Sequence, residues 1–526
     1  MEDNTIHDLL TLYDKGKLCL PEMQRPYVWK QRQVAALIDS LYRDIPIGLL
    51  LLWEPKDTKH FRALKGGKLK DPTTAIIDGQ QRLTSIHDVA NQHKIVMFDT
   101  SDPEGNFQIE NKKTRADDRW VSVYDVWTSD SFTFTDSLAT KLNMTPTERS
   151  ELGKKVAAIN KIKERKPPSF ILKDMDDPEK VTQVFIRINE SGKKLSKSDT
   201  AFAIAALKFP GLVMERLSSI QQKNKNWKTS TASRNSFFAN ALATITVNTV
   251  KMSPFQEYLL RKTTSESKIK KNLKSLEIGL QYTYEFLQNN FGINEKNNLQ
   301  LIPNRSALLP LVNLFSQTNG QLPKQQTELL KLWTFLAFHH SQYVGKAYGK
   351  YLDQDIRAIN PKNTLETIKA WLESIKEWVS DTQVYNIGKG LNDKSRFTVF
   401  FALKLNNATD WWTGTSIENI PKIEYHHIFP RAVLKKAGYT KMEINDPRNI
   451  AVISEYVNRK QKDKKPVDYF NDRSLITDPE RLFSQFVPRK DKQLWEVKNY
   501  EKFLDVRGEL IMEKLNEFVR TSEAEI

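Results

Sequence analysis

The stretch Ile76-Ile-Asp-Gly-Gln-Gln-Arg-Leu-Thr84 decides the fold of the N-terminal part of the chain. Thr73-Thr-Ala-Ile-Ile77 predicts a buried strand, and the dipeptide Asp78-Gly79 ends it because it is a turn signal. From Leu83 onward the apolar residues recur at helical spacing, so a helix begins directly after the turn. This strand, turn and helix predict an α/β region.

The start of this helix is a candidate phosphate site. A helix N-terminus offers free amides and the positive end of a dipole, and an arginine adds a fixed guanidinium. Asp78 could hold a metal ion or position a water. Asp-Gly is also an ordinary turn, and Arg82 could pair with a carboxylate such as Asp39, so both interpretations stay open. The predicted nucleotide-binding residues here are Asp78, Gly79, Gln80, Gln81 and Arg82.

An aromatic cluster precedes this region in Leu20-Pro-Glu-Met-Gln-Arg-Pro-Tyr-Val-Trp29. Aromatic rings can stack on bases, so we expect Gln24 and Tyr27 to contact DNA and Arg25 to contact nucleotide. The alternative is that Tyr27 and Trp29 belong to the core beneath a helix over 31–42. Both interpretations remain open.

The wider pattern predicts an α+β, multidomain protein. Ile47–Trp53 reads as a buried strand, whereas Ala201–Val379 is overwhelmingly helical. A region of short strands over Ile423–Ile453 is followed by helices. We therefore expect an α/β domain over residues 1–205, a helical middle domain over 206–380 and a C-terminal helical domain over 381–526.

The C-terminal domain carries three elements in order. Ile423-Glu-Tyr-His-His-Ile-Phe-Pro430 is extended, Asp446–Ser454 contains a short strand, and Glu455–Asp463 is a helix that Pro466 would end. Ser454 can cap this helix. Two strands and a helix can hold a histidine of the strand against Asn458 of the helix.

Such a set suits phosphodiester hydrolysis. A histidine can deprotonate water, and a second histidine with an asparagine oxygen can hold Mg²⁺ or Mn²⁺. Adjacent residues of a regular strand face opposite sides, so His426 and His427 share one site only if the backbone is irregular. Asn449 could tie down the loop through its amide. Without the residues around them, His426 and His427 could be ordinary polar residues. We interpret the other pair, His339-His340, in that way.

The C-terminal pattern strongly resembles the HNH, or ββα-metal, nucleases. The residues that carry the resemblance are Glu424-Tyr-His-His-Ile-Phe-Pro430, Asn449-Ile-Ala-Val-Ile-Ser454 and Asn458. The resemblance implies that His427 is the general base and that Asn449 orients it. It also implies that His426 and Asn458 bind the metal.

The N-terminal strings resemble the GmrSD-like type IV restriction enzymes, whose first domain has a ParB/sulfiredoxin-like nucleotidase fold. Asp78-Gly-Gln-Gln-Arg82 matches the signature of that domain, and Val184–Ser196 and Tyr343–Arg357 match later segments. The resemblance implies binding or hydrolysis of GTP or ATP, and cleavage of phage DNA with modified bases or, as in the SspE-type relatives, of DNA in a phosphorothioate-marked host. Homo-oligomers or partner proteins of a defence system are compatible with it.

The composition fits a nucleic-acid partner. The chain has 80 Lys and Arg against 64 Asp and Glu, a net charge of +16, which favours polyanions. One cysteine, Cys19, excludes an intrachain disulfide and a Cys-rich zinc site. The first residues lack the pattern of a signal peptide and no apolar run could span a membrane, so we expect a cytoplasmic protein. The basic residues expected along the DNA path, unless they form only a solvated helix face, are Arg459, Lys460, Lys462, Lys464 and Lys465.

Two other functions are compatible with the sequence. One is a DNA-binding regulator or adaptor whose nuclease site is vestigial. The other is an NTPase whose main output is nucleotide hydrolysis.

Overall fold

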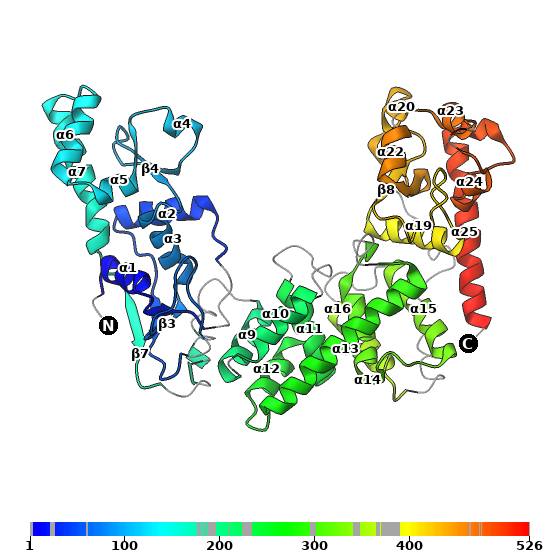
Figure 1. Cartoon of the computed structure of the whole chain (residues 1–526), viewed down its shortest axis with the longest axis horizontal. Coiled ribbons are helices and arrows are strands. Elements are labelled where there is room, and N and C mark those ends of the chain that lie inside the picture. The colour runs from blue at the N-terminus through cyan, green and yellow to red at the C-terminus, as the bar shows by residue number, and fades with distance from the viewer. Residues whose placement is uncertain are drawn as a thin grey trace. The chain divides into compact units, whose positions relative to one another are not determined.

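The computed structural model describes two compact units, each with its own core (Figure 1). Unit 1 comprises Met1–Arg216 and Leu259–Thr263, and unit 2 comprises Leu217–Tyr258 and Thr264–Ile526. The predicted division into three domains stays a prediction, and its boundary near residue 380 lies outside the described residues. The structure describes residues 4–524 except 22–26, 59–60, 176–179, 182, 185–186, 188–195, 210, 224–233, 295–300, 340–347, 364–368, 370–389, 462–463, 473 and 475.

A four-stranded mixed sheet forms the centre of unit 1, in the order β1-β3-β2-β7. β3 runs parallel to β1 and antiparallel to β2, and β2 runs parallel to β7. Successive residues point to opposite faces, so Leu50, Leu52 and Ile76 join one core while Leu51 and Ala75 join another. A sheet covered on both faces explains why its strands are continuous apolar runs. The strands are β1 (Leu18–Cys19), β2 (Leu50–Trp53), β3 (Thr74–Asp78) and β7 (Ser169–Leu172).

Helices cover both faces of this sheet. α1 and α3 contribute Leu9, Tyr13 and Leu83 to one face, and α9 contributes Ala203 and Ala206 to the other. Ser196 accepts a hydrogen bond from the amide of Asp199 and so caps α9. The covering helices are α1 (Ile6–Asp14), α3 (Gln80–Ala90) and α9 (Lys197–Lys208). α2 (Gln31–Tyr42) belongs to another core, and α10 (Val213–Lys223) begins in unit 1 and continues into unit 2.

A second, antiparallel sheet of unit 1 has the order β5-β4-β6. It shares a core with α2 and with helices α5 to α7, in which Val34, Phe98 and Val156 are buried. The elements are β4 (Val96–Asp99), β5 (Phe107–Ile109), α4 (Lys112–Arg115), β6 (Trp120–Ser122), α5 (Val123–Thr128), α6 (Ser131–Lys141), α7 (Pro146–Lys161) and the 3-10 turn η1 (Ile162–Glu164).

The first part of unit 2 is helical, as its sequence predicts. α13 and α14 pack closely because Gly279 leaves room: a Cβ there would lie 2.3 Å from the carbonyl of Val312. α13 ends at Gly292, which adopts the left-handed conformation typical of a C-cap. The elements are α11 (Arg234–Val247), α12 (Met252–Leu260), α13 (Glu266–Phe291), η4 (Arg305–Ala307), α14 (Leu308–Thr318), α15 (Lys324–His339), α16 (Tyr348–Ala358) and α19 (Asp393–Leu405).

The rest of unit 2 is built around a two-stranded sheet and the long helix α25. Phe429 packs on Tyr500 and Phe503 of α25, at ring-centroid distances of 5.1 and 4.9 Å. The elements are β8 (Ile423–His427), α20 (Arg431–Lys436), α21 (Lys441–Ile444), η5 (Pro447–Asn449), β9 (Ile450–Ser454), α22 (Glu455–Gln461), α23 (Pro466–Phe470), α24 (Glu480–Ser484), η6 (Lys492–Trp495), η7 (Val497–Asn499) and α25 (Tyr500–Ala524).

Candidate functional site

The strands β8 and β9 and the helix α22 form the core of the C-terminal site. β8 and β9 pair antiparallel, from Ile423 with Ser454 to His427 with Ile450. β9 is apolar because its first four residues are buried, and α22 begins directly after it, where Ser454 Oγ accepts the amide hydrogen of Val457. The extended segment, the second strand and the helix predicted from the sequence are therefore confirmed.

His426 of β8 contacts Asn458 of α22. Nδ1 of His426 lies 2.7 Å from Oδ1 of Asn458, across 32 residues of sequence. The imidazole is 4 % exposed and has the rings of Trp411 and Tyr469 edge-on to it. Burial lowers the pKa of His426 to about 4, and the bond to Asn458 opposes this only in part. The ring is therefore neutral near pH 7, the form in which imidazole binds metals.

The chemistry of these donors fits a divalent cation. Two ligand atoms at adjacent corners of an octahedron lie about 3 Å apart when each metal bond is about 2.1 Å long. The observed 2.7 Å between Nδ1 and Oδ1 is close to this separation. Nε2 of His426 is buried and has no hydrogen-bond partner among the described residues. Either a proton or a cation can therefore lie between His426 and Asn458.

His427 lies at the end of β8, where the ladder is still regular. The two histidines of the pair therefore leave the strand on opposite faces, and the irregular backbone that would turn them together is not found within the ladder. Nε2 of His427 lies 3.0 Å from Oδ1 of Asn445 and 3.2 Å from Nε of Arg431. Burial, reinforced by the charge of Arg431, lowers the pKa of His427 to about 4.

The two partners of His427 favour opposite tautomers. The guanidinium of Arg431 can only donate, so it requires a lone pair on Nε2, whereas Oδ1 of Asn445 can only accept. The form that accepts from Arg431 has an unprotonated Nε2, which is the form a general base needs. Arg431 is exposed, so this side of His427 is open to solvent.

Asn449 holds the backbone that follows His427. Its side chain is fully buried. Oδ1 accepts from the amide of Phe429 at 2.8 Å, and Nδ2 donates to the carbonyls of Phe429 and Ile444, both at 3.1 Å. The side chain therefore joins the backbone at Phe429 to that at Ile444, and the predicted role of Asn449 in orienting His427 stays a prediction.

Two buried polar residues support the site from far along the chain. Nε2 and Oε1 of Gln485 bond to the carbonyl and amide of Val452, at 2.6 and 3.1 Å. The guanidinium of Arg507 is fully buried and donates to the carbonyls of Arg448, Ile450 and Gln485. Burial lowers the pKa of Arg507 to about 9. Neither residue lies in a motif, so local pattern could not reveal them.

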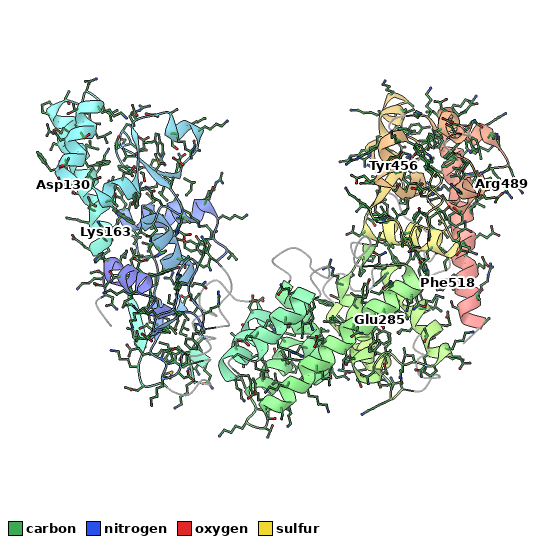
Figure 2. All side chains as sticks on the ribbon, viewed as in Figure 1. Asp130, Lys163, Glu285, Tyr456, Arg489 and Phe518 are labelled. Carbon is green, nitrogen blue, oxygen red and sulfur yellow. The ribbon has the colours of Figure 1, made fainter. Side chains whose placement is uncertain are left out.

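The predicted basic surface lies on and after α22. Lys460, Lys464 and Lys465 are exposed, and the exposed Arg459 pairs with Glu455. Lys462 lies outside the described residues. Sequence reasoning missed Tyr456, which is labelled in Figure 2 and is 59 % exposed on α22. An aromatic residue three and four positions before Arg459 and Lys460 on a charged helix was the available signal.

In unit 1 the predicted nucleotide residues lie where β3 passes into α3. Gly79 is the N-cap with φ of 104°, and a Cβ there would lie 2.3 Å from Leu50 Cδ2, so the turn requires glycine. Arg82 donates to Asp78 at 2.8 Å and to the carbonyls of Ile47 and Leu49, both at 2.9 Å. Asp39, the partner suggested by the sequence, is instead bonded to Arg43.

The glutamines of the same motif have different surroundings. Gln80 is 4 % exposed, and its Oε1 has no hydrogen-bond partner within the described part of the chain. Oε1 of Gln81 accepts from the amides of Val28 and Trp29, at 2.9 and 3.3 Å. Gln81 therefore fixes the segment that follows Pro26.

Tyr27 is half-buried against α3. Its hydroxyl lies 2.8 Å from Oγ of Ser85 and accepts from Lys94, whose Nζ also lies 4.0 Å from the ring centroid. Trp29 packs against the core that contains α2, as one of the two open interpretations holds. The predicted residues Gln24 and Arg25 lie outside the described residues.

Sequence reasoning missed a cluster on α3. His87, Asp88 and His93 offer ligand atoms that all lie within 4.8 Å of one another. The adjacent His and Asp, with a second His five positions after the Asp, were the available signal.

Comparisons with known proteins bear on both ends of the chain. Residues 6–206 match the family described as GmrSD restriction endonuclease, N-terminal domain, so the predicted resemblance of this region is confirmed. The whole chain is similar to an uncharacterized protein of Methanocaldococcus jannaschii, at 22% identity over 98% of this chain and 99% of that protein. Among the described helices, none combines the length and apolar character needed to cross a bilayer.

Proposed function

We propose that the chain is a DNA endonuclease with its cutting site in unit 2, because residues 6–206 match the N-terminal domain of the GmrSD restriction endonucleases. The observation that carries this proposal is the 2.7 Å contact between His426 and Asn458. His426 lies on a strand and Asn458 on a helix, and the order of strand, strand and helix along the chain resembles that of the HNH nucleases. The mechanism is hydrolysis of a phosphodiester bond.

In this proposal each residue has a separate task, and the end of β8 must turn so that His427 reaches the phosphate held at His426 and Asn458. His427 accepts a proton from the attacking water through Nε2, and Arg431 favours the tautomer that can do so. Asn449 keeps the backbone after His427 in place. His426 and Asn458 would hold Mg²⁺ or Mn²⁺, which would supply positive charge to offset the charge that develops on the phosphate oxygens and the leaving 3′ oxygen.

The DNA backbone would follow the exposed basic residues of α22 and its continuation. Lys460 and Lys465 would contact phosphates, and Tyr456 offers a ring on which an unpaired base could stack. Arg459 contributes less because Glu455 already neutralises it. Attraction of this kind is independent of sequence, so it positions DNA rather than selecting it.

We further propose that GTP or ATP binds at the N-terminus of α3 and licenses cleavage of modified phage DNA. Support comes from the match of residues 6–206 and from a helix start that follows a strand and a glycine turn. Since Arg82 is bonded to Asp78 and two carbonyls, the amides of α3 are the groups that would contact the phosphates, and the Asp78 carboxylate would act through a metal ion or a water.

Nicking of supercoiled plasmid tests the proposal. Unmodified, glucosylated hydroxymethylcytosine and phosphorothioate DNA are incubated with Mg²⁺ or Mn²⁺, with and without GTP or ATP. We expect His427→Ala to cut about 10²–10⁴-fold more slowly while it still binds DNA. Asn458→Ala should need more metal, and Mn²⁺ should partly rescue it. His7→Ala, an exposed histidine of unit 1, is the control.

Two outcomes would favour the other functions. A gel shift without cleavage on all three DNAs would indicate a regulator with a vestigial site. Phosphate release that persists without DNA, in the absence of nicking, would indicate an NTPase. Near-normal cutting by folded His427→Ala would refute the role of this histidine.

A further inference from the structure

The cluster on α3 has a histidine held in one tautomer. Nε2 of His87 lies 2.8 Å from a carboxylate oxygen of Asp14. Since a carboxylate only accepts, Nε2 carries the proton and Nδ1 keeps its lone pair. The ring also stacks on Tyr13, with 3.8 Å between centroids and 13° between planes. Both the tautomer and the direction of Nδ1 are therefore fixed.

Nδ1 of His87 points to a place without a protein partner. The side chain is 5 % exposed, and Nδ1 has no hydrogen-bond partner among the residues described. The same holds for Oδ1 of Asp88, whose side chain is fully buried. Buried polar atoms without partners are uncommon because each costs free energy, so two on neighbouring residues of one cluster favour a ligand site there.

A third group completes the cluster at its exposed side. Nδ1 of His93 lies 3.6 Å from Oδ1 of Asp88, and its side chain is 52 % exposed. Two imidazole nitrogens and one carboxylate oxygen thus surround one point. This set favours zinc, iron, cobalt or nickel over Mg²⁺ or Ca²⁺, which prefer oxygen ligands alone.

We propose that His87, Asp88 and His93 bind a first-row transition-metal dication in unit 1, with Asp14 as the carboxylate that orients His87. A carboxylate bonded to the far nitrogen of a metal-binding histidine is the usual arrangement at such sites. The remaining coordination positions are left for water. This site is separate from the one proposed for DNA cleavage and does not depend on it.

Two lysines set the electrostatic cost of metal binding. Nζ of Lys65 lies 2.9 Å from Oδ2 of Asp88, and Nζ of Lys94 lies 3.6 Å from it. Lys65 is 49 % exposed and can turn toward solvent when the cation binds. Removing its charge should therefore strengthen metal binding. An anion held by the same lysines would behave in the opposite way.

Zinc binding by the full-length protein tests this site. Equilibrium dialysis with Zn²⁺ in excess Mg²⁺ is compared for the wild type, His93→Ala and the control His7→Ala, which also removes an exposed histidine. We expect His93→Ala to lose one zinc per chain or to bind it at least tenfold more weakly, with an unchanged melting temperature. A His426→Ala background removes any zinc bound in unit 2.

Two further variants test the geometry. Asp14→Asn should weaken zinc binding roughly 10- to 100-fold, because the amide can donate to Nε2 and move the ring proton to Nδ1. Lys65→Met should strengthen it. Cobalt in place of zinc should give absorption bands that His93→Ala lacks. The proposal is overturned if His93→Ala binds zinc as tightly as His7→Ala, or if Lys65→Met binds it more weakly.

Discussion

Replacing Asn449 with alanine should destabilise unit 2 and slow cleavage although the side chain touches no reacting atom. The change removes three buried hydrogen bonds, one to the amide of Phe429 and two to the carbonyls of Phe429 and Ile444. Each is worth about 1 kcal/mol net, so the free energy of unfolding should fall by about 3 kcal/mol. At roughly 2 °C per kcal/mol for a unit of this size, the melting temperature should fall by roughly 6 °C.

The assay combines thermal melts with plasmid nicking at a temperature where the variant is fully folded. We expect nicking to slow by up to ~10²-fold, because a shift of the segment after His427 displaces the base. Asn471→Ala is the matched control, since this exposed asparagine makes one backbone hydrogen bond through Nδ2. A melting temperature within about 1 °C of wild type would refute the stability argument, and normal nicking by a destabilised variant would refute the positioning role.

Two more predictions concern the partners. The double change Lys460→Ala and Lys465→Ala should reduce the slope of log K against log salt by about two, whereas Lys271→Ala on α13 should not; an unchanged slope would place the DNA elsewhere. Asp78→Asn should abolish nucleotide binding in calorimetry with little change in melting temperature, while Asp118→Asn, an exposed aspartate paired with Lys141, should bind normally; equal affinities would remove Asp78 from the nucleotide site.

Local pattern predicted the elements of the fold but set some bounds too wide. The apolar run Ile47–Trp53 predicts one strand, yet β2 begins at Leu50. The carbonyls of Ile47 and Leu49 accept from Arg82, and Gly48 has φ of 87°, so this part of the run cannot join the ladder. The side chain of Arg82, more than 30 residues away, therefore determines where the strand begins. The spacing of apolar residues in the sequence does not reveal such a contact.

Local pattern also predicted one of the two candidate sites, at His426 and Asn458, but not the other, at His87. The contact of His426 with Asn458 was predictable because β8 and β9 pair and α22 begins directly after β9, which leaves few ways to pack the three elements. Asp14 and His87 are 73 residues apart, and no sequence motif contains both of them. Their pairing follows from the packing of α1 on α3, which only the tertiary structure reveals.

The buried guanidinium of Arg507 has a consequence for the order in which a newly made chain becomes active. Arg507 lies on α25, so its hydrogen bond to the carbonyl of Ile450 at the start of β9 cannot form until that helix has been translated. When β8, β9 and α22 have been synthesised but α25 has not, the carbonyl of Ile450 therefore lacks its hydrogen bond from Arg507. The proposed cutting site would mature only after α25 emerges and docks, so a partly synthesised chain would lack the nicking activity proposed for it.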